Sequence, residues 1–175
     1  MGDDDRVDRE GIDARSITSG RGAGEVLRSS EPVSFYGAVD LDTGEFIEEG
    51  HELEGENVAA KVLIFPRGKG STVGSYVLYG LASNGVAPAA IVNEETETIV
   101  ATGAILGEIP CVDGPDVPLS TFEDGERVVV DADAGRVVVG EDEGEDVVGE
   151  DEVEESDGKG TGPDPSGAPE PAEDG

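Results

Sequence analysis

An apolar run, a glycine-rich loop, a helical stretch and a second apolar run follow one another in the middle of the chain. Residues 61–65 and 89–92 are apolar and partly β-branched, which is typical of buried strands. Residues 72–84 carry apolar side chains at positions 73, 77, 78 and 81, and Asn84-Gly85 provides a helix stop. This order predicts a right-handed βαβ unit whose two strands are parallel.

Strand-like runs also flank this unit on both sides. We expect strands at residues 14–19, 25–29, 111–112, 127–131 and 136–139, and a second, shorter helix at 98–106. The sequence Asp131-Ala132-Asp133-Ala134-Gly135 predicts a hairpin turn between the last two strands. The pattern as a whole predicts an α/β fold with mixed sheets built around the central βαβ unit.

Charge divides the chain into parts. Its 175 residues include 42 acidic and 11 basic ones, a net charge of -31, and residues 141–175 hold 15 of the acids with Lys159 as the one base. That segment has too few apolar residues to offset the entropy of ordering it. We therefore expect a disordered N-terminus at 1–11, a folded domain at 12–140 and a disordered acidic tail at 141–175.

The charge also excludes classes of partner. Nucleic acid and anionic membrane surfaces attract Lys and Arg and would repel this chain. No apolar stretch approaches the roughly 20 residues of a membrane span, and the acidic N-terminus is unlike a signal peptide, so we expect a cytoplasmic protein. Eight arginines against three lysines, together with the acidity, indicate a halophilic protein, because molar salt shortens the Debye length to about 3 Å.

The loop from Phe65 to Ser75 is the strongest candidate site. It leaves a predicted buried strand and opens a helix, so its backbone N–H groups and the helix dipole favour an anion. Arg67 and Lys69, two of the eleven basic residues, lie in it. The structural alternative is that Ser71 only caps the helix and the glycines only shape the turn. The spacing is not that of a P-loop.

Other candidates are weaker. Residues 20–24, Gly-Arg-Gly-Ala-Gly, precede a strand rather than a helix, so we interpret these glycines as turn residues and not as a dinucleotide loop. The single histidine, His51, lies in a polar turn and is expected at the surface. The single cysteine, Cys111, follows Ile109-Pro110 and is expected to be buried. One cysteine allows neither an internal disulfide nor a cysteine-built metal site.

Five motifs in order carry a resemblance to a known family. They are SFYGAVD at 34–40, PRGKGSTVGSY at 66–76, NGVAP at 84–88, IVATGAI at 99–105 and IPCVD at 109–113. In this order they resemble the small subunits of archaeal phosphomevalonate dehydratases, which are members of the aconitase X group. The resemblance covers residues 17–113. Ala38 departs from it, where a second glycine is expected, and the acidic tail lies outside it.

The resemblance implies a swivelling β/β/α domain that forms a heterodimer with a large catalytic subunit. The large subunit would carry an iron–sulfur cluster, so this chain would hold no cofactor of its own. The implied reaction dehydrates (R)-5-phosphomevalonate to trans-anhydromevalonate 5-phosphate, in an archaeal mevalonate pathway to isoprenoids. Ser71 corresponds to the family's proton-accepting serine.

The loop suits that chemistry. A serine hydroxyl is a poor base unless its anion is stabilised, and a helix N-terminus with nearby cations can supply that stabilisation. Arg67, Lys69, Gly70 and Thr72 are the candidate residues for binding a small phosphorylated hydroxy acid.

Other functions remain open. Bacterial-type aconitase X enzymes dehydrate cis-3-hydroxy-L-proline, and this or another hydroxy acid is an alternative substrate. A non-catalytic regulatory subunit is a further alternative. Residues 103–113 also resemble the swivelling phosphohistidine domain of phosphoenolpyruvate-using enzymes, but Thr102-Gly103-Ala104 occupies the segment in which that domain has its histidine.

Overall fold

The computed structural model describes residues 11–140, which form strands and helices in the order expected for an α/β fold. The predicted tails lie outside the described residues, apart from Gly11. The elements are β1 (Ile12–Asp13), β2 (Arg15–Ser16), β3 (Arg21–Arg28), β4 (Val62–Phe65), α2 (Gly74–Ser83), β5 (Ala90–Asn93), α3 (Thr98–Gly107), β6 (Cys111–Asp113), the 3-10 helix η1 (Leu119–Thr121), β7 (Arg127–Asp131) and β8 (Arg136–Val139).

The predicted βαβ unit is present as β4, α2 and β5. β4 and β5 pair in parallel, from Val62 opposite Ala90 to Phe65 opposite Asn93. The strand order is β1-β8-β7-β3-β4-β5-β6-β2, in which β3 to β6 are parallel and the outer strands are antiparallel. The predicted hairpin joins β7 to β8, and Gly135 in its turn has a φ of 71°, which favours glycine.

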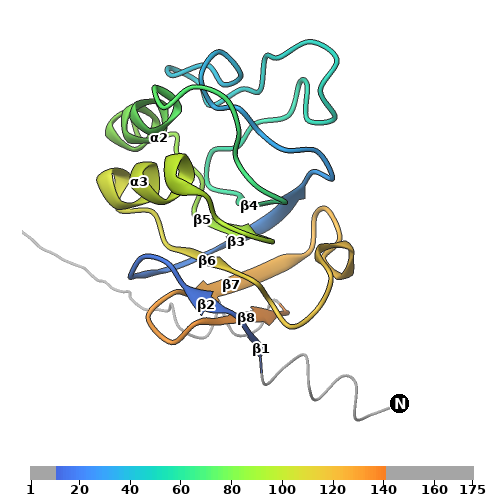
Figure 1. Cartoon of the computed structure of the whole chain (residues 1–175). Coiled ribbons are helices and arrows are strands. Elements are labelled where there is room, and N and C mark those ends of the chain that lie inside the picture. Colours follow the sequence, from blue (N-terminus) through green and yellow to red (C-terminus); the bar gives the residue numbers. More distant parts are fainter. Residues whose placement is uncertain (1–10, 141–175) are drawn as a thin grey trace, which may run out of the picture. The chain divides into compact units, whose positions relative to one another are not determined.

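Two cores make the fold three-layered (Figure 1). Alternate side chains of β4 point to opposite sides: Leu63 and Phe65 join the core under α2 and α3, whereas Val62 and Ile64 join a core with the valines of β7 and β8. The helices therefore cover one face of the parallel strands and the antiparallel strands cover the other. This is the β/β/α arrangement that was expected.

β3 serves both halves of the sheet, because its first half pairs with β7 and its last three residues pair with β4. In the part of β3 that pairs with β7, Gly22 and Gly24 lie so close to Ala89 and Ala60 that a Cβ on either glycine would overlap a backbone carbonyl oxygen. The interpretation of residues 20–24 as a turn was therefore wrong except at Gly20, whose φ is 108°. The other two glycines permit close backbone approach inside a strand.

Three expected elements differ from the prediction by two residues or more at one end, and the other differences are of one residue. The run 14–19 contributes only the short β2, because the chain turns at Ile17 and Thr18, whose amides both donate to the Cys111 carbonyl. The strand expected at 25–29 begins earlier, at Arg21. α2 begins at Gly74, two residues later than predicted, because residues 72–73 form a turn.

α2 and α3 pack unusually closely. A Cβ on Gly103 would lie 2.6 Å from Leu78 Cδ1, and a Cβ on Gly107 would lie 3.2 Å from Ala82. The two glycines therefore form the α3 surface that faces α2. This contact fixes α3, and with it the loop that precedes α3, relative to the start of α2.

The connection between β3 and β4, residues 29–61, contains isolated bridges but no helix or longer strand. It nevertheless buries Phe35, Phe46, Leu53 and Val58 in the core on the helix side. Connections of this length without secondary structure are usually functional. This one packs along the candidate site.

His51 lies in that connection and is buried, so its expected place at the surface was wrong. Its ring stacks on Phe46 with the centroids 4.6 Å apart. Nδ1 accepts a hydrogen bond from the Leu53 amide, so the proton is on Nε2, which donates to the Pro32 carbonyl at 3.0 Å. His51 therefore holds the chain at Pro32 in place, next to the segment that lines the candidate site.

Candidate functional site

The serine loop, residues 66–73, leaves the carboxyl end of β4 and leads into α2. In open α/β sheets, ligands bind in the crevice at this edge. The loop is tied to the neighbouring segment by a parallel bridge between Val33 and Gly68, with the Val33 amide donating to Arg67 O at 3.1 Å and the Lys69 amide donating to Val33 O at 3.0 Å. These backbone hydrogen bonds therefore hold the serine loop in a defined position.

Two glycines let the serine loop pack between its neighbours. A Cβ on Gly68 would collide with Glu97 Oε1 and the Val100 side chain at the start of α3. A Cβ on Gly70, whose φ is 88°, would collide with the Ser34 hydroxyl. The backbone conformation at Gly70 therefore favours glycine, and Gly68 lets the loop pack against the start of α3. Ser34 also contacts the loop, and the sequence analysis assigned it no role at the site.

Ser71 is exposed at the tip of the serine loop. Its Oγ accepts a hydrogen bond of 3.0 Å from the Val73 amide, and its carbonyl accepts one of 2.9 Å from the Gly74 amide. Ser71 thus closes the turn before α2, although the helix N-cap position is Val73. An N–H group directed at Oγ also favours negative charge on that oxygen.

Three further amides are available beside it. Within residues 11–140, no group accepts a hydrogen bond from the backbone N–H of Gly70, Ser71 or Thr72. Successive free amides at the N-terminal end of a helix make an anion-binding surface, because the helix dipole adds to their partial charges. The serine loop can therefore hold a phosphate, a carboxylate or an alkoxide.

Ser75, the second serine of the motif, has a different environment. It is buried, and its Oγ donates to the Thr72 carbonyl at 2.8 Å. This hydroxyl is committed to the first turn of α2. Of the two serines, only Ser71 has a hydroxyl that a ligand outside the domain can reach.

The basic side chains of the loop differ in their contacts. Arg67 Nη2 lies 3.6 Å from Glu94 Oε1 in an exposed pair, which contributes little to stability. Lys69 is exposed, and its ammonium group has no ion-pair partner among the described residues 11–140. Lys69 is thus the freer of the two cations to meet an anion, while Arg67 lies toward the end of β5.

A polar network at the carboxyl ends of β5 and β6 was missed by the sequence analysis. Asp113 accepts two hydrogen bonds from the Arg15 guanidinium, both of 2.8 Å, and one of 2.7 Å from the Thr96 amide. The Thr96 hydroxyl donates to Asn93 Oδ1, and the Asn93 amide group donates to Phe65 O. The signal was a polar residue at the end of each strand, Asn93 and Asp113. The network fixes the loop that leads to Glu97.

Burial alone would raise the pKa of Asp113, but the hydrogen bonds from Arg15 and the Thr96 amide outweigh it and lower the pKa from its ordinary value of 3.8. A lowered folded-state pKa means that the stabilisation is complete above the ordinary value and is lost as pH falls through the folded value. We expect thermal melts in molar KCl to show a falling midpoint below about pH 4. The Asp113→Asn variant should be less stable at neutral pH and show a flatter acid limb. An equally steep limb would assign the effect to other carboxylates.

The described residues do not fit an iron–sulfur cluster. No group of three or more His, Cys, Asp or Glu side chains within residues 11–140 is arranged to hold a metal ion. Cys111 is buried, as expected, and burial raises its pKa to about 12, so it stays a thiol. Iron–sulfur clusters are held mainly by several Cys thiolates, and this chain has one cysteine, so a cluster used by this protein would need ligands from another chain.

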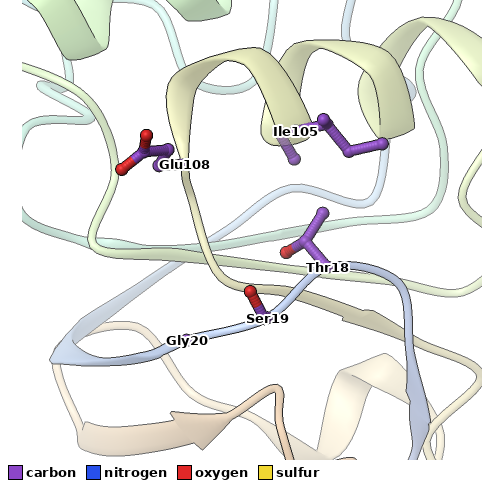
Figure 2. Close-up of a pocket in the computed structure, with 6 residues that line it drawn as sticks. Thr18, Ser19, Gly20, Ile105 and Glu108 are labelled. Atoms are coloured by element: carbon purple, nitrogen blue, oxygen red, sulfur yellow. The ribbon is translucent and has the colours of Figure 1, made fainter.

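A pocket of about 460 Å³ lies away from the serine loop, at the other end of α3 (Figure 2). Thr18, Ser19 and Gly20 line it from before β3, and Ile105 and Glu108 line it from the end of α3. A helix C-terminus and a carboxylate both repel anions. The pocket is therefore unsuited to a phosphorylated or carboxylated ligand, unlike the serine loop.

No helix in the described part of the chain is long and apolar enough to cross a membrane.

Known proteins are similar to this domain in sequence and in fold. Residues 11–139 match the family model described as the aconitase X swivel domain. The phosphomevalonate dehydratase small subunit of Thermococcus kodakarensis is 52% identical over 71% of this chain and 92% of that protein, and the one of Methanocella arvoryzae is 54% identical over 71% and 95%.

A crystal structure of Thermococcus kodakaraensis aconitase X in its holo-form has a chain 50% identical in sequence, with a TM-score of 0.71, covering 75% of this chain and 98% of that one. A protein named UPF0107, solved by solution NMR, has a TM-score of 0.68 at 49% identity and covers 75% and 99%. These findings confirm the resemblance carried by the five motifs and the swivel-domain fold that it implied.

Proposed function

Since the chain belongs to the aconitase X swivel domain family, we propose that it is the small subunit of a hydro-lyase that dehydrates (R)-5-phosphomevalonate to trans-anhydromevalonate 5-phosphate. The proposal rests on the sequence identity of more than 50% to relatives named phosphomevalonate dehydratase small subunit, over nearly their whole length. The product would enter an archaeal mevalonate pathway to isoprenoids.

In this proposal Ser71 is the proton acceptor. Dehydration removes a proton from C2 of the substrate and the hydroxyl group from C3, so a base must reach C2. The Val73 amide donates to Ser71 Oγ, and the free amides of the serine loop lie beside it. These donors favour the alkoxide form and thereby make the hydroxyl a stronger base.

The substrate carries a phosphate and a carboxylate, and the serine loop offers the ammonium group of Lys69, which has no ion-pair partner within residues 11–140. Lys69 and the amides of Gly70 and Thr72 would contact one of those anionic groups. Arg67 would contact the substrate only by leaving Glu94, a change that costs little for an exposed pair.

The proposal requires a large subunit. It would carry the iron–sulfur cluster, which serves as Lewis acid for the leaving hydroxyl in such dehydratases, and the rest of the substrate site. The two chains would form a heterodimer in a cytoplasm rich in salt, since this chain alone bears a net charge of -31.

The test is reconstitution. The small subunit and the large subunit encoded by its native host are purified separately, anaerobically and in molar KCl, and phosphomevalonate consumption is followed by ³¹P NMR. We expect no turnover and no stoichiometric iron with the small subunit alone, and turnover only with both chains. Turnover of cis-3-hydroxy-L-proline instead would identify the alternative substrate. Full activity of the large subunit alone would make this chain regulatory and overturn the catalytic assignment.

A further inference from the structure

The two helices carry no charged side chain. α2 reads GSYVLYGLAS and α3 reads TIVATGAILG. At the chain's average of 30% charged residues, twenty residues would include about six Asp, Glu, Lys or Arg. An outer layer of helices normally places charges on its solvent face. The two helices therefore lack the charged side chains that an outer helical layer normally has.

The outer side of α2 exposes large apolar and aromatic groups instead. Tyr76 and Tyr79, three residues apart, are 66% and 50% exposed, opposite the buried side formed by Val77, Leu78 and Leu81. Val73, one helical turn before Tyr76, is also exposed.

Two residues of the long connection extend this surface. A Cβ on Gly74 would lie 3.6 Å from the Tyr36 amide nitrogen, and a Cβ on Gly80 would lie 2.9 Å from Leu41. Tyr36 is 59% exposed and Leu41 is 42% exposed. We define the tyrosine patch as Tyr36, Leu41, Val73, Tyr76 and Tyr79.

The composition of the tyrosine patch is that of a protein interface. Interface centres are enriched in aromatic residues and depleted of charged ones, and tyrosines bury much area at little cost in side-chain entropy. Exposed apolar patches on an otherwise charged and soluble protein usually mark an interaction site.

The tyrosine patch is continuous with the serine loop, because Val73 belongs to both and its amide donates to Ser71 Oγ. A partner that covers the patch must bring its own surface next to Ser71. If Ser71 acts on a substrate held by the large subunit, this is the face that must approach that subunit.

We propose that the tyrosine patch is the docking surface for the large subunit, whose complementary surface is apolar and uncharged. This inference rests on the proposed function for the identity of the partner. It is supported by three observations: the helices are uncharged, the five side chains of the patch are exposed, and the patch is continuous with Ser71. Neither helix contributes a carboxylate, so an apolar partner surface would desolvate no helix charge at this face.

Ile105 supplies a matched control. It is 62% exposed, and it lies on α3 between Gly103 and Gly107, which face α2, so its side chain points away from α2 and toward the pocket lined by Thr18 (Figure 2). Ile105 is thus an equally exposed apolar residue of the same helical layer, at a place the proposed interface does not need.

The test measures binding without turnover. Wild type and the variants Tyr76→Glu, Tyr79→Glu and Ile105→Glu are titrated against the large subunit in molar KCl by calorimetry, after circular dichroism has verified their folds. We expect each tyrosine variant to raise the dissociation constant by at least about 30-fold, the effect of losing an interface hot spot. We expect Ile105→Glu to change it by less than about threefold.

Three results would overturn the docking surface. One is wild-type affinity in both tyrosine variants. Another is weakened binding in Ile105→Glu but not in the tyrosine variants, which would move the interface to the other end of α3. The third is a dimer of the isolated chain that the tyrosine substitutions dissociate, which would assign the patch to a second copy. A wild-type complex that binds through the patch yet does not consume phosphomevalonate would refute the proposed function alone.

Discussion

Replacing Ser71 by alanine is expected to lower the turnover of the two-subunit complex by at least about 100-fold, the lower range for loss of a positioned general base. The fold should survive, because the one side-chain hydrogen bond lost is that from the Val73 amide, and Ser71 lies in an exposed turn. A lost cap of this kind costs about 1 kcal/mol. Steady-state kinetics at saturating large subunit, with the dissociation constant measured separately, gives the result.

Ser75→Ala is the matched control for that variant. It removes the same group from the same motif, but the Ser75 hydroxyl is buried and donates to the Thr72 carbonyl. We expect a loss of about 1 kcal/mol in stability, the worth of one hydrogen bond, and a small change in turnover. If Ser71→Ala keeps most of its activity in an intact complex, Ser71 only closes the turn before α2, and the base belongs to the large subunit.

Much of the fold could be predicted because its signals are local. The β-branched run of β4, the helical spacing of α2 and the stop at Asn84-Gly85 are each read within a few residues, and they determine the βαβ unit. The candidate loop was found in the same way, since glycines and basic residues between a strand and a helix predict an anion site wherever the sheet lies. Ser71 itself came from the family resemblance, and its role stays a prediction.

The features that could not be predicted from the sequence depend on contacts between distant segments. Gly22 and Gly24 look like turn residues until β3 is seen to cross the carbonyl groups of Ala60 and Ala89. His51 lies among polar neighbours in the sequence, but Phe46 and the Pro32 carbonyl enclose it in space.

The pairing of Arg15 with Asp113 spans 98 residues, and only the pairing of β2 with β6 brings the two together. No periodicity within either segment encodes such a contact. It bears on the site because the Thr96 amide, which Asp113 also binds, precedes the Glu97 carboxylate against which Gly68 packs.

Raising KCl from about 0.01 M to 1 M is expected to raise the thermal midpoint of the isolated chain by at least about 10 °C, which corresponds to a few kcal/mol in a domain of this size. The cause is self-repulsion. Residues 1–140 hold 27 acidic and ten basic residues, a net of -17, and ion pairs such as Arg15–Asp113 and Arg67–Glu94 engage few of those carboxylates. The Debye length falls from about 30 Å to 3 Å over this range, so repulsion across the domain is screened.

Two controls separate screening from other effects of concentrated salt. Sucrose stabilises the folded state because it is excluded from the protein surface, but it screens no charge. At low ionic strength, sucrose should therefore raise the thermal midpoint by less than KCl does. A chain truncated after Gly140 loses 15 acidic residues and one basic residue, yet the -17 that remains should preserve most of the salt response and the activity of the complex. If the thermal midpoint of neither chain changes with KCl, the acidic surface does not destabilise the domain in dilute buffer. That result would contradict the inference of a salt-rich cytoplasm.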